Sequence, residues 1–212
     1  MTRTLTVGAA QLGPIQKSEG RVSVVNRLLS LMTRAKDKGC NLIVFPELAL
    51  TTFFPRYFMP DQTEVDEWFE STIPNQDTQA LFDAAHRYDM AFHLGYAEKI
   101  VADGETHRYN TAILVDRAGD IVAKYRKVHL PGHSEFDPQR AFQHLEKRYF
   151  EIGNLGFPVW HLFGGLIGMC ICNDRRWPET YRVMGLQGVE MVVLGYNTPT
   201  TNSQSDEAPH VR

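Results

Sequence analysis

Short apolar runs alternate with longer amphipathic segments along most of the chain. Strands show a period of two or a short apolar run, whereas helices carry apolar residues every three to four positions. Segment 20–40 has the helical spacing and ends at Gly39, and segment 41–50 contains a near-continuous apolar run typical of a strand buried on both faces. The alternation therefore predicts an α/β fold. The predicted strands are 5–13, 41–50, 90–100, 164–172 and 189–197, with a hairpin over 111–130, and the predicted helices are 20–40, 78–90 and 177–188.

The predicted strands need a covering layer on each face, because a strand buried on both sides presents two apolar surfaces. The pattern offers helices for only one side of a sheet, and the chain stops soon after its last strand. We therefore expect a partner sheet or further sequence to complete the core. Residues 131–158 lack clean periodicity, which predicts an irregular segment around an active site, and 198–212 read as a polar tail. No repeat or linker divides the chain, so we interpret 1–212 as one domain.

Composition narrows the classes of function. The 212 residues are 43% hydrophobic and 22% charged, which suits a globular domain with a substantial core. A net charge of −3 gives no general attraction to nucleic acids or acidic membranes. No apolar run approaches the roughly 20 residues needed to span a bilayer, and the first residues do not resemble a secretion signal. We expect a cytoplasmic protein with neither a nucleic-acid nor a membrane partner.

The three cysteines, Cys40, Cys170 and Cys172, are too few and odd in number for a disulfide framework. Two residues apart in an extended segment, Cys170 and Cys172 are badly placed for a disulfide, and the nearby histidines lack zinc-ligand spacing. Cys172 ends a predicted strand and precedes a predicted helix, where the free N–H groups of a helix start favour a thiolate. Otherwise its thiol needs a positioned base, or it is an inert buried residue like the other two.

Two further strand ends carry chemistry. Glu47 lies toward the carboxyl end of a predicted strand, the edge where α/β proteins gather functional groups, and desolvation there raises a carboxyl pKa toward that of a useful base. Lys127 closes another strand and can hold positive charge over a forming oxyanion. The alternatives are a surface glutamate paired with a lysine and a solvated strand-end lysine; for Lys124 and Arg126 we expect the solvated state.

Arg175 and Arg176 follow Cys172 closely. A guanidinium presents a planar fork of donors that matches a carboxylate in two parallel hydrogen bonds. Two interpretations remain open at this point. The pair binds the carboxylate of a substrate, or it forms ion pairs with Asp174 or Glu179 on the first turn of the predicted helix.

Three segments resemble the Glu-Lys-Cys signature of the nitrilase superfamily, the carbon-nitrogen hydrolases: FPELAL with Glu47, KYRKVHLPG with Lys127 and CNDRRWPE with Cys172. Within that superfamily, LALTTFFPR, YRKVHLPGH, FQHLEKRYFE, CNDRRWPE and GYNTPT are most similar to the N-carbamoyl-D-amino acid amidohydrolases. The resemblance implies a four-layer αββα sandwich, no cofactor or metal, and a homo-oligomer, either a dimer or a tetramer. Chains of that family usually continue further, so we expect the sandwich to be incomplete at the C-terminus here.

The same resemblance implies roles for individual residues. Glu47 is the general base, Cys172 the nucleophile, Lys127 the oxyanion stabiliser and Glu146 a second acid that orients the site. Judged from its local sequence alone, Glu146 is a charge on a helix surface. The residues that the resemblance places around the substrate are Arg175, Arg176, Asn173, His129, His144, Asn197 and Thr198. The local sequence around each histidine instead favours a hydrogen-bonded structural residue.

The expected activity is hydrolysis of N-carbamoyl-D-amino acids to the D-amino acid, carbon dioxide and ammonia through a covalent carbamoyl-enzyme. The preference for D substrates follows from the resemblance only, because no residue spacing reports handedness. Two alternatives remain. One is an aliphatic amidase or nitrilase with the same triad, and the other is a catalytically idle fragment or oligomerising scaffold.

Overall fold

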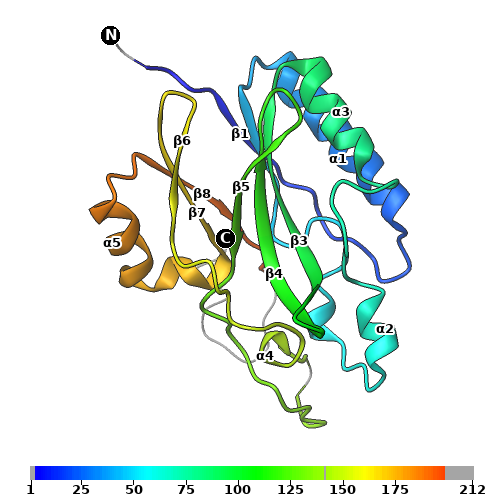
Figure 1. Ribbon diagram of the computed structural model, residues 1–212. Helices are drawn as coiled ribbons and strands as arrows, with labels where there is room; N and C mark the ends of the chain where they lie inside the picture. Colours follow the sequence, from blue (N-terminus) through cyan, green and yellow to red (C-terminus); the bar gives the residue numbers. More distant parts are fainter. Residues whose placement is uncertain (1–2, 141, 199–212) are drawn as a thin grey trace.

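The computed structural model of the chain, which describes residues 3–140 and 142–198, contains two β-sheets packed face to face (Figure 1). The first sheet has the order β1-β2-β3-β4-β5 and the second the order β6-β7-β8. β1, β2 and β3 are parallel, as are β7 and β8, and the other neighbours are antiparallel. The strands are β1 (Val7–Ala9), β2 (Leu42–Val44), β3 (Ala91–Ala102), β4 (Glu105–Val115), β5 (Ile121–Arg126), β6 (Val159–Leu162), β7 (Gly165–Ile171) and β8 (Met191–Gly195).

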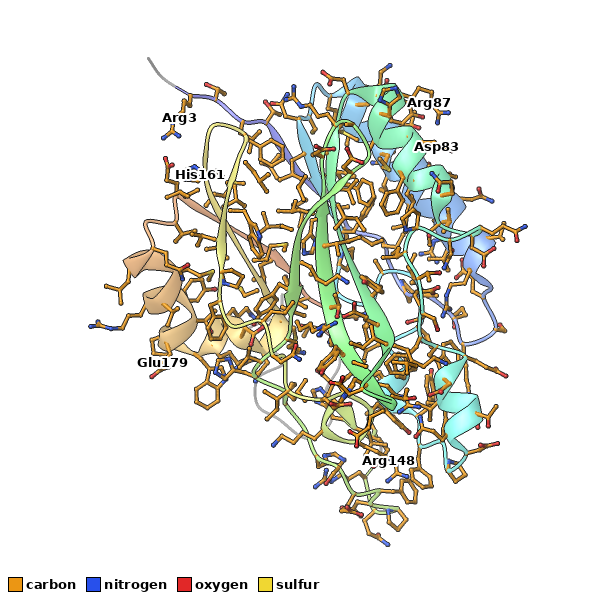
Figure 2. The ribbon with its side chains drawn as sticks, viewed as in Figure 1. Arg3, Asp83, Arg87, Arg148, His161 and Glu179 are labelled. Carbon is orange, nitrogen blue, oxygen red and sulfur yellow. The ribbon has the colours of Figure 1, made fainter. Side chains whose placement is uncertain are left out.

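Helices cover the outer face of each sheet (Figure 1). The helices are α1 (Arg21–Asp37), α2 (Gln62–Asp66), α3 (Gln79–Tyr88), α4 (Glu146–Tyr149) and α5 (Pro178–Leu186). α1 and α3 lie on the first sheet, and the exposed Asp83 and Arg87 of α3 point away from it (Figure 2). α5 buries Thr180 and Met184 against the second sheet. The four-layer αββα arrangement is therefore confirmed.

Two apolar cores hold the layers together, one on each face of the first sheet. Neighbouring residues of β4 show the division: Ile113 packs into the core under α1 and α3, whereas Leu114 packs between the two sheets. Both side chains are fully buried, and each such burial stabilises the fold by roughly 1.5–3 kcal/mol. Because successive strand residues point to opposite faces, one strand contributes to both cores. The helix-side core also contains Leu28 and Phe92, and the inter-sheet core contains Tyr125 and Met169.

The structure differs from the sequence pattern at several places. The pattern offered helices for one side of a sheet only, whereas α5 covers the second sheet. The strand over 159–162 (β6) was missed, and it pairs with β7 through a turn at Phe163 and Gly164, both with positive φ. β4 also begins at Glu105, earlier than predicted, because Asp103 and Gly104 form a tight turn from β3. Residues 131–158 are largely irregular as predicted, and residues 199–212 of the predicted tail lie outside the described residues.

Candidate active site

Four segments that follow strands bring their polar residues to one end of the sandwich. Glu47 lies three residues after β2, Lys127 follows β5 directly, Cys172 follows β7 directly, and Asn197 lies just after β8. Glu146, which begins the short helix α4, reaches the same place from the irregular segment. The sequence separated these residues widely, and the paired sheets bring them together.

A fully buried lysine lies at the centre of this cluster. Lys127 Nζ donates to Glu47 Oε1 at 2.7 Å and to Glu146 Oε2 at 2.5 Å, and all three side chains have no exposed surface. Burial by itself would lower the pKa of Lys127, but the two carboxylates outweigh it and raise that pKa. The lysine is therefore a fixed cation, and the alternative of a solvated strand-end lysine is excluded.

Glu47 is held by three donors. Besides Lys127, Asn110 Nδ2 donates to Oε1 at 2.8 Å and the backbone N–H of Asn197 donates to Oε2 at 3.1 Å. Gly95 leaves room for this segment, because a Cβ there would lie 2.9 Å from Glu47 Cα. Burial raises the pKa of Glu47 despite the attraction of Lys127, and the charge of Glu146 raises it further. Glu47 is thus a buried carboxylate whose proton affinity is increased, and the surface alternative is excluded.

Glu146 is also completely buried, so its interpretation as a helix-surface charge is wrong. Its second oxygen, Oε1, lies 3.0 Å from His144 Nε2. Burial would raise the pKa of Glu146, but Lys127 and the His144 hydrogen bond outweigh it, so that pKa lies below its usual range. The ring of the exposed His144 also meets Phe53 edge-on, with 6.0 Å between ring centroids. His144 therefore lies at the outer side of the buried cluster.

Cys172 stands next to this cluster in an uncommon backbone conformation. Its φ is +46°, in the left-handed region that L residues rarely adopt, and it starts a 3₁₀ turn over Cys172–Arg176 rather than an α-helix. Burial and the charge of Glu47 raise the pKa of the Cys172 thiol to about 12, although Lys127 acts in the opposite direction. The expectation of a helix-stabilised thiolate is therefore wrong. The thiol rests protonated and interacts with Glu47, so its ionisation requires a base.

The two arginines behave differently from one another. Arg175 is half-buried: its Nη1 donates to the carbonyl oxygen of Cys172 at 2.7 Å, and its guanidinium lies 5.0 Å from the ring centroid of Tyr196. Arg176 is exposed on the same turn. Among residues 3–140 and 142–198, no salt bridge joins Arg175 to a carboxylate, and Glu179 is exposed at the start of α5 (Figure 2).

The carboxylate of Asp174 accepts hydrogen bonds from residues other than the two arginines. It is fully buried and accepts hydrogen bonds from Tyr125, Ile171 and His129. His129 is therefore hydrogen-bonded to Asp174, which agrees with the interpretation of its local sequence as a structural histidine. Asn173 Nδ2 donates to the backbone oxygen of His129 at 3.0 Å.

Several functional neighbours were not anticipated from the sequence. Asn110, Tyr125 and Asp174 were not assigned to the site, although a polar residue such as Asn110 inside an apolar strand signals a buried partner. Arg126 was expected in solvent but is buried on the opposite face of the first sheet. Thr198 is half-buried at the end of the described segment.

The described residues lack two kinds of feature, a metal-ligand cluster and a membrane-spanning helix. Among them, no three His, Cys, Asp or Glu side chains lie together as a metal site. Within the same part of the chain, none of the helices combines the length and apolarity needed to cross a membrane.

The sequence model of the carbon-nitrogen hydrolases matches residues 6–210. The chain belongs to this family. Among curated carbon-nitrogen hydrolases and related enzymes, it is 30% identical to a citrullinase from Francisella tularensis over 170 residues, covering 79% of this chain and 53% of the relative. It is 29% identical to an N-carbamoylputrescine amidase from Solanum lycopersicum, covering 97% of this chain and 62% of the relative. A nitrilase from Pyrococcus abyssi is 33% identical, with 76% and 54% covered.

Solved structures agree on the fold. A carbon-nitrogen hydrolase from Helicobacter pylori superposes with a TM-score of 0.77 at 24% identity, covering 98% of this chain and 65% of that one. An amidase from Nesterenkonia sp. gives a TM-score of 0.69 at 19% identity, with 100% and 71% covered. The chain spans between 53% and 62% of the length of the curated relatives named above. These likenesses establish family and fold, and they leave the substrate open.

Proposed function

We propose that the chain carries the catalytic centre of an amidohydrolase that acts on N-carbamoyl amino acids, with the D series as its substrates. The observation that carries the proposal is the buried Lys127 between Glu47 and Glu146, with the Cys172 thiol beside it. Three relatives have names that refer to citrulline, N-carbamoylputrescine or a ureido compound, which supports a carbamoyl group as the reacting part.

The proposed reaction begins with proton transfer from the Cys172 thiol to the Glu47 carboxylate. The sulfur attacks the carbamoyl carbon, and the carbonyl oxygen becomes an oxyanion that Lys127 and a backbone N–H stabilise. When the oxyanion collapses, the C–N bond to the amino acid breaks, and Glu47 returns its proton to the leaving nitrogen. The raised pKa of Glu47 suits this exchange, because the best acid-base group has a pKa near the working pH.

Hydrolysis of the carbamoyl-enzyme uses the same base. Glu47 removes a proton from water, the resulting hydroxide attacks the carbamoyl carbon, and the sulfur leaves with the proton from Glu47. The released carbamic acid decomposes to carbon dioxide and ammonia. Glu146, whose other oxygen is bonded to His144, holds Lys127 from the other side, so the ammonium stays charged throughout.

The arginine pair supplies the proposed selectivity for a free carboxylate. Arg175 uses one nitrogen on the Cys172 carbonyl, which places its guanidinium at the site and leaves other donors for a ligand. Arg176 lies exposed on the same turn and completes the proposed clamp. Asn173, Asn197 and Thr198 are proposed to add hydrogen bonds around the bound carboxylate.

A second candidate is an aliphatic amidase or nitrilase. Relatives named nitrilase and formamidase and the likeness to a solved amidase favour it. The same triad serves these substrates, but they have no carboxylate to clamp. A third outcome is a chain that is idle on its own.

A substrate panel separates these candidates. It compares an N-carbamoyl-D-amino acid, its L enantiomer, the corresponding N-alkyl urea without a carboxylate, an aliphatic amide and a nitrile. We expect the N-carbamoyl-D-amino acid to give the highest kcat/KM. Arg175→Ala and Arg176→Ala should each raise KM for it by about ten-fold to a hundred-fold, equivalent to about 1.5–3 kcal/mol for a charge-assisted hydrogen bond.

Arg182→Ala is the matched control, because Arg182 is an exposed arginine on α5. It should leave KM unchanged. Equal turnover of the N-alkyl urea, or wild-type KM in both clamp variants, would favour the amidase. No turnover of any member of the panel would support the idle chain.

A further inference from the structure

Asp174 is a buried carboxylate that the proposed reaction does not use. Its side chain is fully buried and accepts four hydrogen bonds. Oδ2 accepts from the Tyr125 hydroxyl at 2.8 Å and from the Ile171 N–H at 3.0 Å. Oδ1 accepts from the His129 backbone N–H and from its ring Nδ1, each at 2.9 Å. Any buried carboxylate requires such partners. Here the positions of the partners in the fold also indicate a further role.

The four donor groups come from segments of both sheets. Tyr125 lies in β5 of the first sheet, two residues before Lys127, and His129 lies two residues after Lys127. Ile171 is the last residue of β7 in the second sheet and directly precedes Cys172. One carboxylate therefore ties the segment that carries the buried ammonium to the strand end that carries the thiol.

The conformation of Cys172 depends on such support. A residue with a side chain keeps a positive φ only where its surroundings fix it. The Ile171 N–H bond to Asp174 closes the turn on one side, and Arg175 holds the Cys172 carbonyl on the other.

His129 is fixed in the same assembly. Its ring stacks on Trp177, with centroids 4.9 Å apart and an interplanar angle of 12°, and lies 5.8 Å from the Phe157 ring. A ring packed between two aromatic side chains with Nδ1 on Asp174 has little freedom to follow a substrate. Its contacts fit a support for Asp174 better than a substrate ligand.

We propose that Asp174 is a positioning residue that sets the separation of the Lys127 ammonium and the Cys172 thiol by anchoring both strand ends, and that His129 acts through it. The inference rests on the proposed function for its kinetic consequence only. The anchoring itself concerns the geometry of Cys172 and can be measured without turnover.

The principal test variant is Asp174→Asn in the full chain. The amide keeps the shape and one oxygen that accepts from His129, but its NH₂ group faces the Ile171 N–H, so the anchor to the second sheet is lost. We expect kcat to fall by about ten-fold to a hundred-fold, because misplacement by about 1 Å has effects of that size. KM should change by less than about three-fold. A merely structural Asp174 would lower the unfolding temperature and leave kcat of the folded protein unchanged.

Tyr125→Phe provides a milder variant that removes one of the four bonds without adding a donor. We expect kcat to fall less than in Asp174→Asn, but measurably. Tyr96→Phe is the matched control, because Tyr96 is equally buried but lies in the core on the helix-covered face. It should change neither kcat nor KM. If Asp174→Asn does not fold, the comparison of kcat between Tyr125→Phe and Tyr96→Phe tests the proposal instead.

Alkylation by iodoacetamide separates this inference from the proposed function. We expect the rate of labelling at Cys172, mapped by mass spectrometry, to fall several-fold in Asp174→Asn and to fall less in Tyr125→Phe. Cys40, which is half-buried far from these contacts, serves as the internal reference. If the wild type turns over none of the substrates, the proposed function fails while altered labelling still supports the anchor. Unchanged kcat and unchanged labelling in a folded variant would overturn it.

Discussion

Arg126 and Lys127 are neighbours in the chain, but their side chains enter buried charge clusters on opposite faces of the first sheet. Lys127 points between the sheets, where it shares its charge between Glu47 and Glu146. Arg126 points to the helix-covered face and donates through Nε to Glu98 at 2.7 Å. We call these the site cluster (Glu47, Lys127, Glu146) and the Glu98 cluster (Glu98, Lys124, Arg126).

The two clusters have inverted ratios of charge. The site cluster contains one cation and two carboxylates, and the Glu98 cluster contains two cations and one carboxylate, because Lys124 Nζ also donates to Glu98 at 2.6 Å. Burial raises the pKa of Glu47 beyond what Lys127 can offset. Burial also acts to raise the pKa of Glu98, but Arg126 and Lys124 outweigh it and lower that pKa.

The difference explains how similar residues differ in role. An excess of carboxylate leaves the site cluster with a group that can exchange a proton, whereas an excess of cation keeps Glu98 ionised. The ion pairs of the Glu98 cluster hold β5 in place and take no part in the proposed reaction. Since adjacent residues carry the two cations, the Glu98 cluster also holds the strand that presents Lys127.

The largest expected effect is on catalysis. Glu47→Gln keeps the shape of the side chain but removes the base, so we expect kcat on an N-carbamoyl amino acid to fall about a hundred-fold or more. Glu98→Gln, measured at a temperature where it is folded, should keep kcat within about three-fold of wild type. Near-normal turnover by a folded Glu47→Gln variant would contradict the assignment of Glu47 as base.

The next effect is on stability. Glu98→Gln leaves Arg126 buried without its anionic partner, and we expect the free energy of unfolding to fall by about 3 kcal/mol, as for other broken buried ion pairs. Urea unfolding at neutral pH measures it. Thr111→Val is the control, because Thr111 donates one hydrogen bond to Glu98 at 2.9 Å, and its loss should cost only about 1 kcal/mol.

The same variant has a pH signature. The folded pKa of Glu98 is lowered, so its contribution to stability is present above the unfolded pKa of about 4.3 and is lost as pH falls through the folded value. The difference in stability between wild type and Glu98→Gln should therefore shrink in acid. A difference that stays constant down to acid unfolding would show that Glu98 is not held as a carboxylate.

The smallest effect concerns the pH dependence of the site cluster. Asn110 donates to Glu47 and lowers its pKa, so Asn110→Ala should raise that pKa further. We expect the acid limb of the kcat/KM profile to move to higher pH, because the ionised form of Glu47 loses a hydrogen bond. Asn154→Ala is the matched control: Asn154 accepts from Arg126 Nη1 at 2.8 Å, in contact with the other cluster. An equal shift of the acid limb in Asn110→Ala and Asn154→Ala would contradict the separation of the two clusters.

The periodicity of the chain determined most elements of the fold. The spacing of apolar residues in α1 and the alternation of β4 side chains between the two buried faces of the first sheet depend on geometry that repeats every few residues, so a short window of sequence carries it. The same information placed Glu47, Lys127 and Cys172 at strand ends. The weak elements α2 and β6 escaped, because a segment of four or five residues is too short to show a period.

The environment of each charge was decided only by the tertiary structure. Lys127 and Glu47 are 80 residues apart in the chain, and the Asn197 N–H that holds Glu47 is 150 residues away from it. Glu146 begins a helix of one turn and has no local feature that separates it from a surface charge. Its burial, the protonated state of Cys172 and the capture of Asp174 by Tyr125 and His129 all depend on which strands meet across the sandwich. A pKa is set by desolvation and by charges within a few ångströms, and those distances exist only after the two sheets have packed.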